Sequence, residues 1–219
     1  GRVYQFFHGR FAPGGAMNPL EWLHQRGVMN RRVSVLSAHI APLFHHGCRV
    51  LDVGCGDGAL AAAIMRLRPD LAIEGIDVLA RRQAQVPITL YDGHSLPFTD
   101  AAFDAVLLVD ALHHAQQPEE LLREARRVAC RQLLIKDHSN DAILADTTLS
   151  FMDWVGNSHQ GVDIPCNYWP KEEWLAQIKT LDVTTRSWMP NLGLYPWPAN
   201  LLFDRSLHFI ADLQIADVF

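Results

Sequence analysis

The sequence predicts an α/β fold, a Rossmann-like, doubly wound and mostly parallel sheet of seven strands with helices on both faces. Two observations carry this prediction. Short apolar runs alternate with helical patterns between residues 49 and 137. The first run, residues 49–53, ends in three alternate glycines, Gly54, Gly56 and Gly58, and a helical stretch follows at once. A strand, a glycine turn and a helix in this order form the ligand-binding corner of a doubly wound sheet.

The remaining elements follow from the apolar periodicity and from turn and capping residues. One or two helices are expected from Pro19 to about Pro42, before the sheet begins. Five parallel strands are expected at residues 49–53, 72–77, 88–91, 104–109 and 132–137, with helices at about 58–68 and from 118 to 128. Further helices are expected at 140–156 and from 170, and strands at 182–188 and 206–213 form an antiparallel pair at one edge.

Length and composition indicate one domain. A chain of 219 residues, nearly half of them apolar, fits a single sizeable core and leaves little room for two. The four cysteines are scattered without a C-x-x-C pair, which predicts neither a disulfide framework nor a zinc site. We find no apolar run of membrane-spanning length and no signal-peptide pattern, so we expect a soluble, cytoplasmic protein without a membrane partner.

The net charge of −5 conceals a basic amino-terminal arm. Residues 1–48 hold five arginines (Arg2, Arg10, Arg26, Arg31 and Arg32) against a single acid, Glu21. Such an arm is compatible with nucleic acid or with an anionic substrate. With so few arginines and no lysine, we interpret it as the solvated face of a helix and expect no nucleic-acid partner.

The glycine spacing and the acids that follow it point to one family. The turn has the spacing G-x-G-x-G with Asp52 two places before it, whereas dinucleotide-binding proteins use G-x-G-x-x-G. Asp77 ends the second strand, Asp92-Gly93 follows the third, and Leu112-His113-His114 follows the fourth. This ordered set, from residue 49 to 137, resembles the class I S-adenosylmethionine-dependent methyltransferases.

The resemblance implies S-adenosylmethionine as the cofactor. The carboxylate of Asp77 would then accept hydrogen bonds from ribose hydroxyls, and Asp92 would accept one from the adenine amino group. The first turn of the helix after the glycines would receive the methionine carboxylate. The full set of implied cofactor-binding residues is Asp52, Gly54, Cys55, Gly56, Gly58, Asp77, Val78, Asp92, Gly93, His94 and Asp110.

Residues just past the fourth and fifth strands are the catalytic candidates. His113, His114 and His138 come there, and histidine is the side chain best suited to proton transfer near neutral pH. No ligand spacing indicates a metal, and we expect none. The aromatics Trp154, Tyr168, Trp169, Tyr195 and Trp197 hint at a planar or apolar acceptor.

We therefore expect methyl transfer to a small organic acceptor within one domain. Its parts would be a helical arm or lid at 1–47, a cofactor-binding core at 48–138, and substrate-side helices with the last two strands at 139–219. An RNA or protein methyltransferase remains an alternative, favoured by the basic arm but lacking an N/D-P-P-Y/F tetrapeptide. A cofactor-binding protein without methyl transfer is another, and the glycine spacing disfavours a nicotinamide oxidoreductase.

Overall fold

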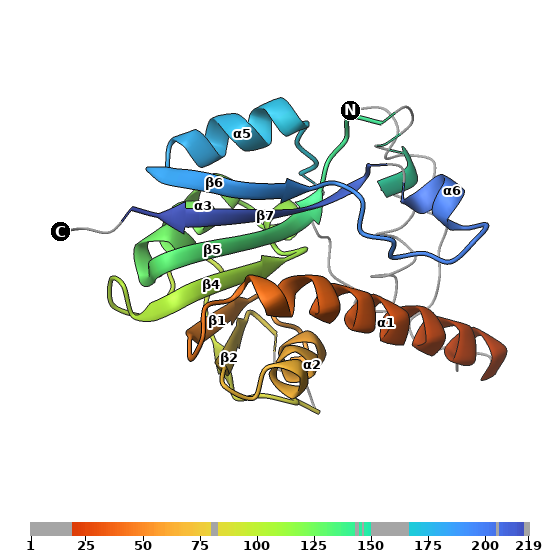
Figure 1. Ribbon diagram of the computed structural model, residues 1–219, viewed down its shortest axis with the longest axis horizontal. Helices are drawn as coiled ribbons and strands as arrows, with labels where there is room; N and C mark the ends of the chain where they lie inside the picture. Colours follow the sequence, from red (N-terminus) through yellow and green to blue (C-terminus); the bar gives the residue numbers. More distant parts are fainter. Residues whose placement is uncertain are drawn as a thin grey trace.

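The computed structural model describes residues 19–79, 83–142, 145, 147–149, 167–204 and 206–216 (Figure 1). Seven strands form one sheet in the order β3-β2-β1-β4-β5-β7-β6. They are β1 (Arg49–Val53), β2 (Ala72–Asp77), β3 (Ile88–Leu90), β4 (Phe103–Val109), β5 (Ala129–His138), β6 (Val183–Met189) and β7 (His208–Ile215). The first five run parallel, and β7 runs antiparallel to both β5 and β6. The predicted fold class is confirmed.

Helices cover both faces of this sheet, as Figure 1 shows. On one face, α1 (Pro19–Ile40) and α2 (Ala59–Leu67) pack through Leu36 and Ile64 onto apolar side chains of the strands. On the other face, α3 (Pro118–Val128) and α5 (Lys171–Lys179) pack through Leu122 and Trp174. The short helices η1 (Ala41–Leu43), η2 (Leu112–His114) and α6 (Asn200–Phe203) lie in connections. Burial of each such apolar side chain stabilises the fold by about 1.5–3 kcal/mol.

The central strand β4 explains why its sequence is a continuous apolar run. Val106 and Leu108 point to the face of α3 and α5, whereas Ala105 and Leu107 point to the face of α1 and α2. All four are fully buried. A strand covered on both faces loses the alternation of polar and apolar residues that marks a half-exposed strand.

Several element boundaries differ from the sequence prediction by one to three residues, and the start of the fifth strand differs most. The fifth strand begins at Ala129, three residues earlier than expected, because α3 ends at Val128 and the chain enters the sheet without a loop. Phe103 pairs with Ala129 across an irregularity before regular pairing resumes at Gln132. The predicted helix 140–156, with Trp154, falls largely outside the described residues.

The last two strands pair as the sequence predicts. β7 lies between β5 and β6, and its first residue, His208, pairs with His138 at the end of β5. Because β7 runs antiparallel to β5, its beginning lies at the sheet edge where the parallel strands end. The start of β7 therefore adds side chains to the edge that carries the glycine turn.

Candidate active site

The glycine turn after β1 can be built only from glycine at two positions. Gly54, Gly56 and Gly58 have φ values of +74°, +60° and +77°, in the left-handed region that disfavours other residues. A Cβ on Gly54 would lie 2.8 Å from the Cβ of Ala111, and one on Gly58 would lie 2.5 Å from Val86 Cγ2. A Cβ on Gly56 would meet no atom within 4 Å. The turn is packed against the protein at both ends and open in its middle.

Two acids lie beside this turn. Asp77, 6% exposed at the end of β2, accepts hydrogen bonds from the Gly56 N–H at 2.8 Å and from the Leu79 N–H at 2.9 Å. Asp52 in β1 is 2% exposed, and burial, assisted by the charge of Asp77, raises its pKa to about 7. The turn is therefore bordered by one carboxylate and by a second carboxyl group that changes its charge near neutral pH.

Cys55 faces away from the open side of the turn. A Cβ on Gly75 would overlap its Sγ, so the thiol occupies the space that this glycine of β2 leaves free. Burial, with the charges of Asp52 and Asp77, raises the pKa of Cys55 to about 12. The thiol stays protonated at neutral pH and lies 3.8 Å from the backbone oxygen of Gly56, to which it donates.

The loop after β3 brings the third predicted acid to the same edge. One oxygen of the exposed Asp92 accepts hydrogen bonds from the backbone N–H groups of His94, at 2.9 Å, and Ser95, at 3.1 Å, which lower the pKa of Asp92. A Cβ on Gly93 would lie 3.3 Å from Cγ1 of Val78. The loops after β2 and β3 are thus in contact, and Asp77, Val78, Asp92 and Gly93 lie along one edge.

Asp110 lies where β4 ends, in a left-handed backbone conformation with a φ of +52°. One carboxylate oxygen is 2.5 Å from Nζ of Lys136, and the other pairs with the guanidinium of Arg32 from α1. Lys136 is fully buried in β5 and also lies 3.3 Å from Nδ1 of His208. Asp110 therefore sits between two cations, beside Ala111, which packs against the glycine turn.

His113 and His138 meet at a buried carboxylate. Nδ1 of His113 is 2.5 Å from Oδ1 of Asp137, and the backbone N–H of His138 donates to the same oxygen at 2.8 Å. Burial alone would raise the pKa of Asp137, but the charge and hydrogen bond of His113 hold that pKa well below its usual range. Burial, followed by the charges of Lys136 and His113, lowers the pKa of His138 to about 3.

The other aromatic candidates divide into two groups. The ring centroid of the half-buried His114 lies 3.9 Å from that of His113, and Tyr168 stacks on His113 with a centroid distance of 5.7 Å. Tyr195 lies 6.1 Å from the ring of His208. By contrast, Trp169 packs on Trp174 in the core and Trp197 is 79% exposed.

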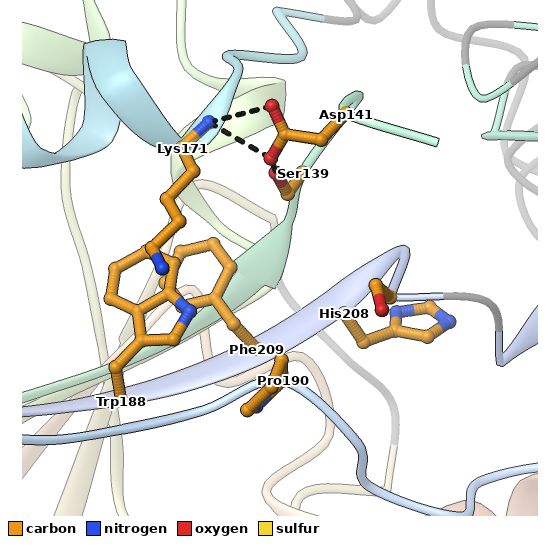
Figure 2. Close-up of a pocket in the computed structure, with 8 residues that line it drawn as sticks. Ser139, Asp141, Lys171, Trp188, Pro190, His208 and Phe209 are labelled. Carbon is orange, nitrogen blue, oxygen red and sulfur yellow. Dashed lines mark hydrogen bonds between the residues drawn. The ribbon is translucent and has the colours of Figure 1, made fainter. Parts of the chain in front are cut away.

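A cavity of about 190 Å³ opens at the ends of β5, β6 and α5 (Figure 2). Trp188 and Phe209 stack at one end of it, and His208 lies at the other. The backbone N–H of Lys171 donates to the carboxylate of Asp141 at its rim. The cavity is lined by Ser139, Asp141, Lys171, Trp188, Pro190, Ser206, His208 and Phe209.

Sequence reasoning missed three residues of this site: Arg32, Lys136 and His208. Lys136 carried a signal, because it interrupts the apolar run Leu133–Ile135 of a strand expected to be buried. A buried lysine requires a partner, which here is Asp110. Arg32 and His208 had no comparable signal, since their elements reach this edge only through the tertiary fold.

Comparisons with known proteins agree with this geometry. Residues 51–132 match a family described as a methyltransferase domain. A ubiquinone biosynthesis O-methyltransferase of Cereibacter sphaeroides is 31% identical over 140 residues, which are 58% of this chain and 52% of that protein. These matches cover parts of the chain, and they support a resemblance to the class I S-adenosylmethionine-dependent methyltransferases.

Two further proteins extend the comparison. A demethylmenaquinone methyltransferase of Thermotoga maritima is 32% identical over 91 residues, 38% of this chain and 40% of that protein. A solved S-adenosylmethionine-dependent methyltransferase of the same organism has a TM-score of 0.63 at 15% identity, covering 88% of this chain and 94% of that one. The chain spans about half the length of the curated relatives it matches, at 40% and 52% of the two named here.

The cofactor of this family is S-adenosylmethionine, and the residues of the turn fit it. The middle of the turn is open at Gly56, and the acids Asp77 and Asp92 lie at the strand ends next to it. Within the described residues, none of the helices combines the length and the apolar character that crossing a membrane requires.

Proposed function

We propose that this methyltransferase transfers the methyl group of S-adenosylmethionine to a small organic acceptor. One observation carries the proposal: an open glycine turn with two acids lies next to a buried group of histidines, on neighbouring strand ends of one sheet. Methyl transfer is an in-line displacement, so the protein must mainly align the acceptor with the methyl group and exclude water. When bound, the cofactor supplies a methyl group already activated by its sulfonium.

We assign the cofactor to the edge formed by the ends of β1, β2 and β3. Asp77 would bind the ribose hydroxyls. Asp92 accepts both backbone hydrogen bonds of its turn through one oxygen, and its other oxygen would accept a hydrogen bond from the adenine. The backbone of Gly54 to Gly58 and the first turn of α2 would hold the methionine part, with Asp52 near its ammonium. Cys55, Val78, Gly93 and His94 would contribute backbone and packing.

We assign the acceptor to the ends of β4 and β5. His113, His114 and His138 would contact it there, with Tyr168 beside them. Asp110 belongs to both sides, because the next residue, Ala111, packs against Gly54 of the turn while the Asp110 carboxylate faces Lys136. The relatives are named for ubiquinone biosynthesis and for demethylmenaquinone, so a hydroquinone-type ring is the first acceptor to screen.

The three parts of the chain follow from these assignments. Residues 48–138 would form the cofactor-binding core, and 139–219 the substrate side. The arm 1–47 would cover the acceptor, since Arg32 of α1 reaches Asp110 and Arg31 donates to the backbone oxygen of Leu194 at 3.1 Å. Both interactions hold α1 against these residues, which supports the assignment.

The proposal is tested first by ligand-induced stabilisation. A ligand at 100 times its dissociation constant adds about 2.7 kcal/mol to the free energy of unfolding. For a domain of this size, that raises the melting temperature by roughly 5–10 °C. We expect this rise with S-adenosylmethionine and S-adenosylhomocysteine but not with NAD.

Matched variants locate the effect. Asp77→Asn should lose most of the rise in melting temperature. Glu74→Gln, in the same strand but ion-paired with Arg49, should keep it. Formation of S-adenosylhomocysteine with a hydroquinone, and a product heavier by one methylene, would then establish turnover. No rise with either sulfur ligand would refute the cofactor assignment. A rise without turnover on any acceptor, including RNA and protein, would leave a binding protein.

A further inference from the structure

Four side chains from two segments of the chain, 110–113 and 137–138, bring their ligand atoms close together. Asp110, His113, Asp137 and His138 each place one nitrogen or oxygen so that all four atoms lie within 4.8 Å of one another. Three of the side chains are buried, and Asp110 is 14% exposed. We propose that this four-residue cluster binds a divalent transition-metal ion. The proposal goes beyond methyl transfer, and its test does not depend on that activity.

The spacing of the four atoms suits a metal. With bonds of about 2.0–2.1 Å, neighbouring ligands of a tetrahedral zinc site are about 3.3 Å apart. Nδ1 of His138 lies 3.4 Å from Nδ1 of His113 and 3.5 Å from one oxygen of each carboxylate. The contact between His113 and Asp137, at 2.5 Å, must widen by about 0.8 Å, and any pair near the 4.8 Å limit must shorten.

Hydrogen bonding alone leaves this cluster incompletely satisfied. A proton on Nδ1 of His113 is offered to Asp137 at 2.5 Å, while Nδ1 of His138 faces the same nitrogen at 3.4 Å. The second oxygen of Asp137 is fully buried and has no hydrogen-bond partner within the described part of the chain. A buried polar atom in this position calls for a water or an ion. A cation among the four atoms would engage both imidazoles and the carboxylate together.

The surrounding charges favour some ions over others. Lys136 and Arg32 both hold Asp110, so they offset its charge and make it the weakest of the four ligands. The two imidazoles and Asp137 are the three stronger ligands. Two histidines with one carboxylate suit Fe²⁺, Co²⁺ or Zn²⁺, whereas Mg²⁺ and Ca²⁺ prefer oxygen ligands only. A bound cation here would also lower the pKa of a hydroxyl group that touched it, which favours oxygen acceptors.

Cobalt provides a direct test with the full chain. After incubation with Co²⁺ and gel filtration, we expect about one ion per chain and visible d–d absorption of a low-symmetry site. Zn²⁺ should displace it and Mg²⁺ should not. His138→Gln and Asp137→Asn should each weaken cobalt binding by about tenfold or more, because even the loss of a residue that only supports a metal ligand has an effect of that size.

The control variant is His46→Gln. His46 belongs to a surface pair with His45, and its side chain is 91% exposed, so it reports adventitious binding to surface histidines. It should retain the cobalt spectrum. Circular dichroism shows which variants are folded, and if Asp137→Asn is not, the comparison uses His138→Gln alone.

Three results would overturn the proposal. The first is a wild-type protein that retains no cobalt, whatever the variants do. The second is a cobalt affinity that is unchanged in folded His138→Gln or reduced in His46→Gln. The third is displacement by Mg²⁺ as readily as by Zn²⁺. The thermal shift with S-adenosylmethionine is measured separately, so failure of the metal site is distinguishable from failure of the methyltransferase assignment.

Discussion

Replacing Asp52 by asparagine should make the protein more stable above neutral pH. The carboxyl group is 2% exposed in β1, and burial and the neighbouring Asp77 raise its pKa from 3.8 to about 7. A raised carboxyl pKa means that the folded protein holds this proton more tightly than the unfolded chain does. The free energy of unfolding therefore falls as the pH rises from about 4 to about 7.

The size of the effect follows from the pKa difference. One pKa unit corresponds to 1.36 kcal/mol, so a difference of about three units costs on the order of 4 kcal/mol once the carboxyl is fully ionised. Below about pH 4 the group is protonated in both states and the cost disappears. The asparagine side chain of the variant would carry no charge at any pH. The Asp52→Asn variant should thus approach the wild type in stability at pH 4 and exceed it at pH 8 by on the order of 4 kcal/mol in the free energy of unfolding.

Urea unfolding of both proteins at pH 5, 6, 7 and 8 measures this difference. The matched control is Asp182→Asn, an exposed aspartate that follows α5 far from the glycine turn. For this variant, the plot of the free energy of unfolding against pH should remain parallel to that of the wild type. If the plot for Asp52→Asn were also parallel to that of the wild type, Asp52 would not be held protonated by the fold, and the electrostatic description of this edge would be wrong.

Two packing predictions compare a buried position with an exposed one. Gly58→Ala would place a Cβ against the Val86 side chain at a residue with a left-handed φ, so it should lower the free energy of unfolding in urea by about 2 kcal/mol or more. Gly193 has a left-handed φ but open space around it, so Gly193→Ala should lower that free energy by about 1 kcal/mol. Trp174→Phe removes a 2.9 Å hydrogen bond to the backbone of β5 from a buried ring and should cost about 1–3 kcal/mol. Trp197→Phe, at a ring 79% exposed, should change the free energy of unfolding by less than the roughly 0.5 kcal/mol typical of surface changes. Equal effects within either pair would contradict the packing described here.

The sheet could be predicted because its signals are local. The apolar run of β4, the glycine turn and the acids after β2 and β3 each lie within a few residues of one another in the sequence. Even the antiparallel pair of β6 and β7 followed from two short strands after the last helix. Strand ends were less accurate, since Ala129 enters the sheet through pairing with Phe103, a contact that no local pattern encodes.

The cluster at the ends of β4 and β5 could be predicted only in part. The positions of His113, His114 and His138 after these strands indicated which edge they occupy. Their partners could not be inferred, because Arg32 comes from α1 and His208 from β7, far away in the sequence. Metal-ligand motifs are recognised by close spacing along the chain, and this cluster has none, so we expected no metal from the sequence. Whether it binds one is a question that only the tertiary arrangement raises.

The two ends of the site differ in charge, and this difference bears on the ligand. Asp52 and Asp77 form an acidic corner in which, among the described residues, neither acid is paired with a basic side chain. A cationic ligand would be drawn to that corner and would lower the cost of ionising Asp52. S-Adenosylmethionine carries an ammonium and a sulfonium, whereas a nicotinamide dinucleotide brings two phosphates that two acids would repel. The electrostatics and the glycine spacing therefore disfavour the nicotinamide cofactor for independent reasons, and S-adenosylmethionine affinity should fall as the pH drops below about 7, where Asp52 takes up its proton.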